Sequence, residues 1–150
     1  VWGGVGPLND GGSYDPHGTD SDGDGFGCAV DCDDGDPDVT AIPGQVQGLL
    51  FGAGGATLEW PSLALAAGPA TRYDVVRGVV AELPVGSGGS EICLQPDLAG
   101  GPGPVTLALT DGDPPAGESF WYLVRGDNDC GAGSYGSTSA GIPRTTAACP

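Results

Sequence analysis

Residues 71–77 read TRYDVVR and residues 119–125 read SFWYLVR. At a period of two, the first stretch places Tyr73 and Val75 on one face, and the second places Phe120, Tyr122 and Val124 on one face. Such alternation is typical of strands that bury one face. The residues expected on the buried faces are Tyr73, Val75, Phe120, Tyr122 and Val124.

The chain from Gly44 onward consists of similar short runs separated by turn residues. The whole sequence holds 30 Gly and 14 Pro, a composition that disfavours long helices and suits many turns. Seven short strands in about 100 residues predict an antiparallel β-sandwich, and hence an all-β fold. Val85–Pro104 is longer than an ordinary connection and is assigned to no strand. The other five predicted strands are Gln45–Phe51, Ala56–Trp60, Val79–Leu83, Val105–Leu109 and Ala132–Ser139.

Three of these runs resemble strands of fibronectin type III domains. Leu58-Glu59-Trp60-Pro61, Tyr73-Asp74-Val75 and Tyr122-Leu123-Val124 look like strands B, C and F of that family. The resemblance covers about residues 44–150 and implies a seven-stranded sandwich in which the Trp and both Tyr side chains point into the core. It implies little about function, because one fold serves many functions.

The charge of the chain is strongly negative. Twenty acidic residues face four basic ones, for a net charge of -16, and every basic residue is Arg. A phosphate backbone or an anionic bilayer would be repelled, which argues against nucleic acid and membrane surfaces as partners. No run approaches the roughly 18 apolar residues of a membrane span. Multivalent cations are the natural counter-ions.

The acidic residues are concentrated between Asp20 and Asp38. The stretch begins DSDGDGFG at residues 20–27, with carboxylates at the alternate positions 20, 22 and 24. Carboxylates spaced in this way converge on one cation when the chain curls around it, and calcium takes six to eight oxygen ligands. Gly25 falls at the sixth position, where the loop turns sharply, and Phe26 at the seventh offers its backbone carbonyl. Asp31 stands at the twelfth, where an EF-hand loop has Glu.

A second acidic run, DCDDGDPD, follows at residues 31–38, and Pro37 excludes the helix that would follow an EF-hand loop. The combined pattern resembles thrombospondin type 3 calcium repeats and a DxDxDGxG…DCDDxDP metal-binding repeat of secreted bacterial proteins. That resemblance implies one or more calcium ions, with Asp31 or Asp33 placed to bridge two of them. The alternative is a solvated acidic linker. The predicted ligands are Asp20, Asp22, Asp24, Phe26, Asp31, Asp33, Asp34, Asp36 and Asp38.

Five cysteines match no zinc-binding spacing and are expected mostly in disulfides, which indicates an extracellular or cell-surface location. Cys28 and Cys32 are close enough in sequence for a small disulfide across the loop, or each pairs elsewhere. For the sandwich, a bond between Cys93 and Cys130 is favoured over one between Cys130 and Cys149. The odd count leaves one cysteine unpaired or bonded to another chain.

The sequence is therefore divided into a Gly-rich N-terminal segment (1–18), an Asp-rich calcium-binding segment (19–43) and a sandwich (44–150). His17 is the only histidine, and the chain has no HExxH, GxSxG or P-loop pattern, so we expect no enzyme. We expect a secreted structural or adhesive protein that calcium stabilises. The apolar residues Val1–Leu8 suggest that it self-associates into a fibre or surface polymer by pairing with the edge of a neighbouring copy.

Two other readings remain open at this stage. In the first, the sandwich is a module that binds a polysaccharide or a cell-surface protein. Trp121 alternates outward from Tyr122 and is the candidate ligand-binding aromatic residue. In the second, the chain is an accessory domain of a larger secreted hydrolase, whose catalytic residues would lie elsewhere.

Overall fold

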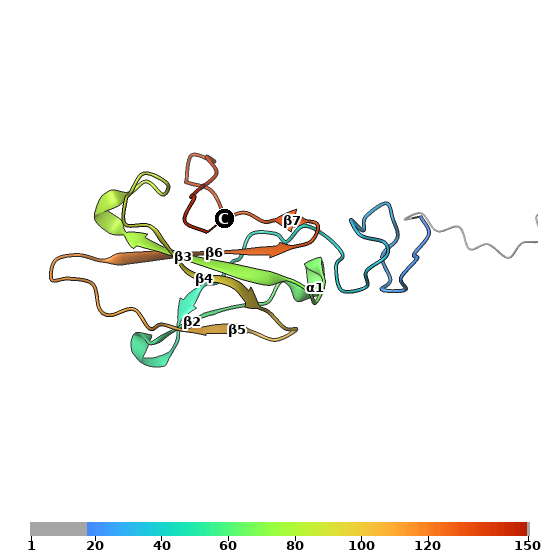
Figure 1. Ribbon diagram of the computed structural model, residues 1–150, viewed down its shortest axis with the longest axis horizontal. Coiled ribbons are helices and arrows are strands. Elements are labelled where there is room, and N and C mark those ends of the chain that lie inside the picture. The colour runs from blue at the N-terminus through green and yellow to red at the C-terminus, as the bar shows by residue number, and fades with distance from the viewer. Residues whose placement is uncertain (1–17, 150) are drawn as a thin grey trace, which may run out of the picture.

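The computed structural model describes residues 18–149, in which two antiparallel sheets pack against each other (Figure 1). Seven strands in two such sheets confirm the predicted all-β class. The three-stranded sheet has the order β1 (Leu50–Phe51), β2 (Thr57–Trp60), β5 (Val105–Ala108). The four-stranded sheet has the order β4 (Ile92–Ala99), β3 (Arg72–Val79), β6 (Phe120–Asn128), β7 (Gly131–Ala132).

Three short helices complete the fold. They are the 3-10 helices η1 (Ala53–Gly55) and η2 (Val80–Glu82) and the single-turn α1 (Ala64–Ala67). None of the helices within residues 18–149 has the length and apolar character needed to cross a membrane. Residues 1–17 and 150 lie outside the described part of the chain, and the predicted pairing of Val1–Leu8 with a neighbour falls there.

The core between the sheets is built on Trp60 of β2 and Tyr73 of β3. Their rings meet edge to face with centroids 5.6 Å apart, and both side chains are almost completely buried. The Tyr73 hydroxyl accepts a hydrogen bond of 2.6 Å from the Leu63 N–H, so its polar end is satisfied. Val75 of β3 pairs with Val124 of β6 in the same core. The predicted inward positions of these residues are confirmed.

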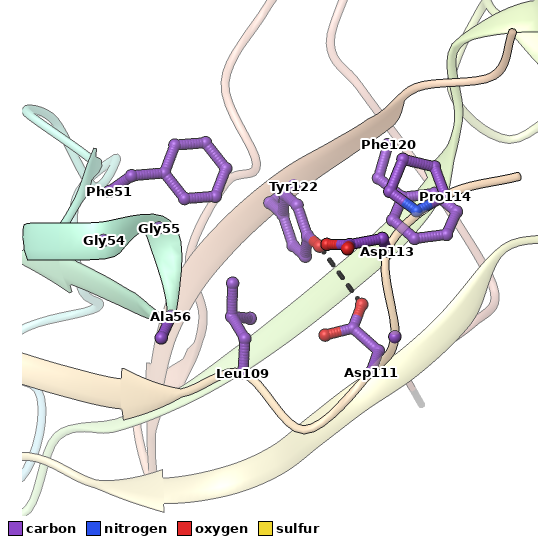
Figure 2. A pocket seen from close by; sticks show the side chains of 11 residues that line it. Phe51, Gly54, Gly55, Ala56, Leu109, Asp111, Asp113, Pro114, Phe120 and Tyr122 are labelled. Carbon is purple, nitrogen blue, oxygen red and sulfur yellow. Dashed lines mark hydrogen bonds between the residues drawn. The ribbon is translucent and has the colours of Figure 1, made fainter. Parts of the chain in front are cut away.

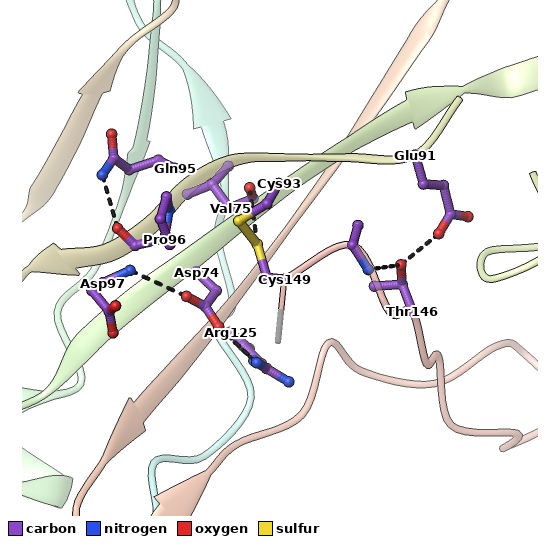
Figure 3. The surroundings of a disulfide bond; sticks show 11 residues. Asp74, Val75, Glu91, Cys93, Gln95, Pro96, Asp97, Arg125, Thr146 and Cys149 are labelled. Atoms are coloured by element: carbon purple, nitrogen blue, oxygen red, sulfur yellow. Dashed lines mark hydrogen bonds and ion pairs between the residues drawn. A yellow bond between two sulfur atoms is a disulfide. The ribbon is translucent and has the colours of Figure 1, made fainter. Parts of the chain in front are cut away.

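The outer face of the four-stranded sheet is also covered, by the C-terminal segment. Val76 points away from the main core and packs with Tyr135 and Cys149 in a second buried cluster. A disulfide between Cys93 of β4 and Cys149 holds the segment against the sheet, with Cα atoms 4.9 Å apart (Figure 3). Strand β3 is therefore buried on both faces.

The predicted return strand Val79–Leu83 is wrong. Residues 80–82 form η2, and the strand that pairs with β3 on this side is β4, which lies within the unassigned stretch Val85–Pro104. The pairing of β3 with β4 shifts register twice, and Asp97 adopts a positive φ of 48°. Bulges of this kind disturb the period of two, which concealed β4 in the sequence.

Two other predicted strands are much shorter in the structure. Of Gln45–Phe51 only the last two residues form β1, while Gln45 makes an isolated bridge with Arg125. Of Ala132–Ser139 only the first residue lies in β7. Gly136 has a φ of +85°, which a strand does not accommodate, and the chain then turns across the outer face of the sheet.

The predicted disulfide pairings are also wrong. Cys32 bonds Cys130 in the β6–β7 turn, across a sequence separation of 98 residues, while Cys93 bonds Cys149. Cys28 is the free cysteine of the described residues and is exposed. The pairs follow the packing: Cys32 lies where the acidic segment meets the sandwich, and Cys93 lies on the outer face that the C-terminal segment crosses.

Hydrogen bonds join the acidic segment to one end of the sandwich. The Thr40 N–H donates to the Ala67 carbonyl at 3.1 Å, and the Ala70 N–H donates to the Asp38 carbonyl at 2.9 Å. Gly68, at the end of α1, has a φ of +98°, and a Cβ there would overlap the Asp38 carbonyl. This close approach requires glycine.

Asn128 and Val39 complete the junction. The Asn128 amide donates to the carbonyls of Ala41 and Ala67, each at 2.8 Å, and so bridges the two parts of the chain. Val39 is the one large apolar side chain of residues 18–40 that is almost fully buried, with 1% of its surface exposed. The acidic segment is thus attached mainly by polar contacts and one disulfide.

Candidate metal site

The first three aspartates of the acidic segment converge. One carboxylate oxygen from each of Asp20, Asp22 and Asp24 lies within 4.8 Å of the others. Asp20 accepts hydrogen bonds from the N–H groups of Gly23 (2.7 Å) and Gly25 (3.2 Å), which wraps the backbone around it. Both glycines have positive φ, +82° and +98°, so the curl depends on residues without a Cβ.

Asp31 is a fourth candidate ligand and lies outside the group of three whose oxygens are within 4.8 Å of one another. Its side chain is buried, with 8% of the residue exposed, after a turn in which the N–H groups of Val30 and Asp31 donate to the Gly27 carbonyl. Burial raises the pKa of the Asp22 carboxyl, and the charges of Asp24, Asp31 and Asp20 raise it further, against a hydrogen bond from the Asp24 N–H that lowers it. The negative charges of three other aspartates therefore disfavour ionisation of Asp22.

Two oxygens of this group lack hydrogen-bond partners. Asp22 Oδ2 and Asp31 Oδ2 are both inaccessible to solvent, and neither accepts a hydrogen bond within the described residues. A buried carboxylate oxygen without a partner is costly, and no Lys or Arg occurs in residues 18–43 to neutralise the group. A divalent cation held here would offset part of this charge and could supply a partner for these oxygens.

Two side chains that the sequence analysis did not single out support the loop. The Thr40 hydroxyl donates to Asp24 Oδ2 at 3.1 Å and links the loop to the junction with the sandwich. Ser21 donates to Asp34 through both its N–H (3.1 Å) and its hydroxyl (2.6 Å). Nothing in the one-dimensional spacing pairs residues that are 13 and 16 positions apart.

The remaining predicted carboxylate ligands are not part of this group. Asp34 is engaged by Ser21, and Asp36 accepts a hydrogen bond from the Asp38 N–H at 3.0 Å. Asp33 and Asp38 are exposed, and neither belongs to a group of three acidic side chains within 4.8 Å among residues 18–149. The Phe26 side chain is 42% exposed, while its N–H donates to Asp24 Oδ1 at 2.7 Å. The structure thus brings together the first three aspartates, and Asp33, Asp34, Asp36 and Asp38 of the second acidic run lie outside this group.

A second group of aspartates, missed in the sequence, lies on the four-stranded sheet. Asp74, Asp97 and Asp127 come from strands that are distant in sequence, and their oxygens also lie within 4.8 Å. Arg125 binds Asp74 Oδ2 through two nitrogens, at 2.7 and 2.9 Å, and Arg72 lies 3.6 Å from Asp127. Because two guanidinium groups already form ion pairs with these carboxylates, we interpret the group as a salt-bridge network rather than a metal site.

Trp121 is not the exposed aromatic platform that the alternation predicts. Its ring packs against Gly78 and the Cys149 cluster, and its Nε1 donates to the Val79 carbonyl at 3.2 Å. The side chain does point outward from the sandwich core, as predicted. The C-terminal segment then covers that outer face, so the residue is half-buried.

Comparisons with known proteins provide no relative. No family model, no curated protein and no solved structure matches this chain. The resemblances to fibronectin type III domains and to calcium repeats therefore stay predictions. What can be said of function rests on the geometry of the chain itself.

Proposed function

We propose that the acidic segment binds a calcium ion and that the protein is a secreted structural or adhesive module stabilised by this ion. The proposed ligands are the carboxylates of Asp20, Asp22, Asp24 and Asp31, with the Phe26 carbonyl. The observation that carries the proposal is the convergence of Asp20, Asp22 and Asp24, together with the buried, unpartnered oxygens Asp22 Oδ2 and Asp31 Oδ2.

Calcium fits this donor set better than other common ions. The proposed ligands are all oxygens, which disfavours zinc and copper, whose sites use imidazole or thiolate. Magnesium requires a near-ideal octahedron and retains several waters, whereas calcium accepts a flexible loop with many carboxylates. Four carboxylates around one ion leave a net negative charge, which favours a doubly charged cation over a singly charged one.

The ion would act on the fold rather than on a substrate. Without it, four carboxylates repel one another within a segment that has almost no apolar core. A bound ion would offset that repulsion in a loop whose Asp24 accepts a hydrogen bond from Thr40, and the Thr40 N–H in turn binds the sandwich at Ala67. Calcium binding is thereby coupled to the attachment of the segment.

Three features support the class of protein that we propose. The strand orders β1-β2-β5 and β4-β3-β6-β7 suit a fibronectin type III-like sandwich, the fold that the strand motifs resemble. Two disulfides favour an oxidising, extracellular location. The net charge of -16 keeps a surface protein soluble and attracts divalent cations.

A calcium titration by calorimetry tests the proposal. We expect saturable binding of one ion to the unmodified chain, and a loss of affinity of at least about tenfold, or about 1.4 kcal/mol, in Asp22→Asn and Asp24→Asn. Asp33→Asn is the matched control, because it removes one charge from the same segment at an exposed side chain outside the group. Equal weakening in all three variants would show that calcium is attracted by the overall charge of the segment and not by a defined site. Absence of binding would show that the segment is only a solvated acidic linker.

A further inference from the structure

A second candidate site lies at the end of the sandwich opposite the acidic segment. A hollow of about 370 Å³ opens between η1 and the loop that joins β5 to β6 (Figures 1 and 2). This volume lies in the range of small-molecule sites. The residues around it are Phe51, Gly54, Gly55, Ala56, Leu109, Asp111, Gly112, Asp113, Pro114, Phe120 and Tyr122.

One wall of the hollow is aromatic and unusually open. Phe51 on strand β1 is 60% exposed, and its ring meets Tyr122 edge to face, with centroids 5.7 Å apart and an interplanar angle of 84°. The contact orients the Phe51 ring and leaves most of its surface free. A Cβ added at Gly54 or Gly55 would meet no atom within 4 Å, so nothing crowds this rim. The wall offers a flat apolar surface to a ligand.

The opposite side of the hollow includes the Asp111 carboxylate, in which only one of the two oxygens accepts hydrogen bonds from the described residues. The Asp111 side chain is 9% exposed, and its Oδ2 accepts hydrogen bonds from Arg77 Nη1 at 3.0 Å and from the Tyr122 hydroxyl at 3.1 Å (Figure 2 shows the second). Its Oδ1 is buried and has no partner among the described residues. A ligand hydroxyl that reaches this oxygen would remove that cost.

Asp113 adds a second acceptor at the rim of the hollow. Its carboxylate takes part in none of the hydrogen bonds or ion pairs found between residues of the described range, 18–149, and the residue is exposed. The hollow therefore combines one apolar face with two carboxylate acceptors. Hydroxyl groups arranged on the edge of a flat ring match that combination.

We propose that this hollow binds a neutral saccharide. A sugar ring presents a flat C–H face to Phe51 and hydroxyl donors to Asp111 Oδ1 and Asp113. An acidic sugar or a phosphate is disfavoured by both carboxylates and by the net charge of -16. A cation is a poorer match than a neutral ligand, because Arg77 already neutralises Asp111 and lies 4.1 Å from the Phe120 ring centroid.

This assignment replaces Trp121 as the candidate binding residue and does not depend on calcium. The hollow uses β1, β6 and the β5–β6 loop, whereas the metal site uses residues 20–31 at the other end (Figure 1). Saccharide binding that persists in chelator therefore separates this inference from the proposed calcium function. Either can fail without the other.

The test is a titration of the ¹⁵N-labelled chain with neutral oligosaccharides: cello-, xylo-, manno-, laminari- and chito-hexaose at millimolar concentration. An oligogalacturonate and an oligolysine serve as the anionic and cationic probes. We expect at least one neutral probe to shift the amide signals of Phe51, Gly54, Gly55 and Asp111–Asp113, in calcium and in chelator alike.

Variants then locate the binding. Phe51→Ala should weaken it by about tenfold or more, and Asp113→Ala by several-fold. Leu50→Ala is the matched control, since Leu50 is the strand neighbour of Phe51, is 65% exposed and does not line the hollow. Several results would overturn the proposal: no neutral probe binds, oligolysine binds more tightly, or the Leu50 variant weakens binding as much as the Phe51 variant.

Discussion

The acidic segment and the sandwich are held in place by different means. The sandwich buries Leu58, Trp60, Tyr73 and Val75 almost completely between two sheets. The acidic segment buries one large aliphatic side chain to that extent, Val39, and its loop is shaped by carboxylates that accept hydrogen bonds from nearby N–H groups. One chain thus contains a region stabilised by apolar burial and a region that, under our proposal, calcium stabilises by compensating its charge.

The two regions should respond differently to divalent cations. Apolar burial is insensitive to divalent cations, whereas four gathered carboxylates repel one another unless a cation is bound. The sandwich should therefore fold with or without calcium. The acidic segment should be ordered only when the ion, the Cys32–Cys130 disulfide and the polar junction act together.

The largest expected effect is on the sandwich. Trp60→Ala removes a side chain that is 1% exposed and packs edge to face on Tyr73, and we expect a loss of about 3–5 kcal/mol in the free energy of unfolding. Denaturant unfolding followed by fluorescence measures it, in calcium and in chelator. The two losses should be equal. A loss found only in calcium would contradict the claim that apolar burial stabilises the sandwich independently of the ion.

The next effect concerns the disulfide between the regions. Replacing both Cys32 and Cys130 by Ser should lower the free energy of unfolding by about 2–4 kcal/mol, because the bond closes a long loop in the unfolded chain. Cys28→Ser is the control and should change little, since this thiol is free and exposed. Equal losses in both variants would contradict the pairing described above.

A smaller effect is expected at the polar junction. Asn128→Ala removes the amide that donates to the Ala41 and Ala67 carbonyls at a site only 5% exposed, which should cost about 1–3 kcal/mol. Asp129→Ala, next in the chain, removes an exposed ion pair with Arg72 and should cost less than about 1 kcal/mol. Thermal unfolding in calcium compares the two, and a cost for Asp129→Ala that matches or exceeds that of Asn128→Ala would contradict the role given to Asn128.

The mildest effect is the dependence of calcium affinity on pH. Because the pKa of Asp22 is raised, it takes up a proton at a pH above 3.8, the ordinary aspartate value, and the proton competes with calcium. As the pH is lowered, calcium affinity should therefore begin to fall at a pH higher than 3.8. The stability of the calcium-free loop should depend on pH in the opposite direction. Because the pKa of Asp22 is raised in the folded loop, the protonated carboxyl favours the folded loop at low pH, and this stability is lost as the pH rises through the raised pKa.

Calorimetric titrations at several pH values test this dependence. Asp22→Asn should show a flatter profile than the unmodified chain, because the group with the raised pKa is absent. A profile of equal slope in the variant would place the competing proton on another carboxyl.

The sequence predicted the parts of the fold that depend on local periodicity. In the core strands, every second residue was expected to point inward, and Tyr73, Val75 and Tyr122 do face or pack against the core as this period of two predicts. Strand β4 was missed because Pro96 and the bulge at Asp97 interrupt its pattern. The cover over Trp121 was missed because it comes from the C-terminal segment, which reaches that face only through tertiary packing.

The candidate metal site was likewise predicted only in part from the sequence. Alternate aspartates with Gly at the sixth position predicted the convergence of Asp20, Asp22 and Asp24, since closely spaced residues meet through backbone curvature alone. The contacts of Asp24 with Thr40 and of Asp34 with Ser21 depend on how the loop folds back, and spacing does not encode them. The disulfide partner of Cys32 lies 98 residues away and follows from the docking of the two regions.

The most direct test of this account is amide hydrogen exchange of the full chain, followed by mass spectrometry, in calcium and in chelator. The account predicts that peptides from residues 18–40 exchange much faster in chelator, while peptides from β3 and β6 keep their protection. Unchanged exchange in the acidic segment, or an equal loss of protection in both regions, would contradict the claim that calcium orders one region and apolar burial the other.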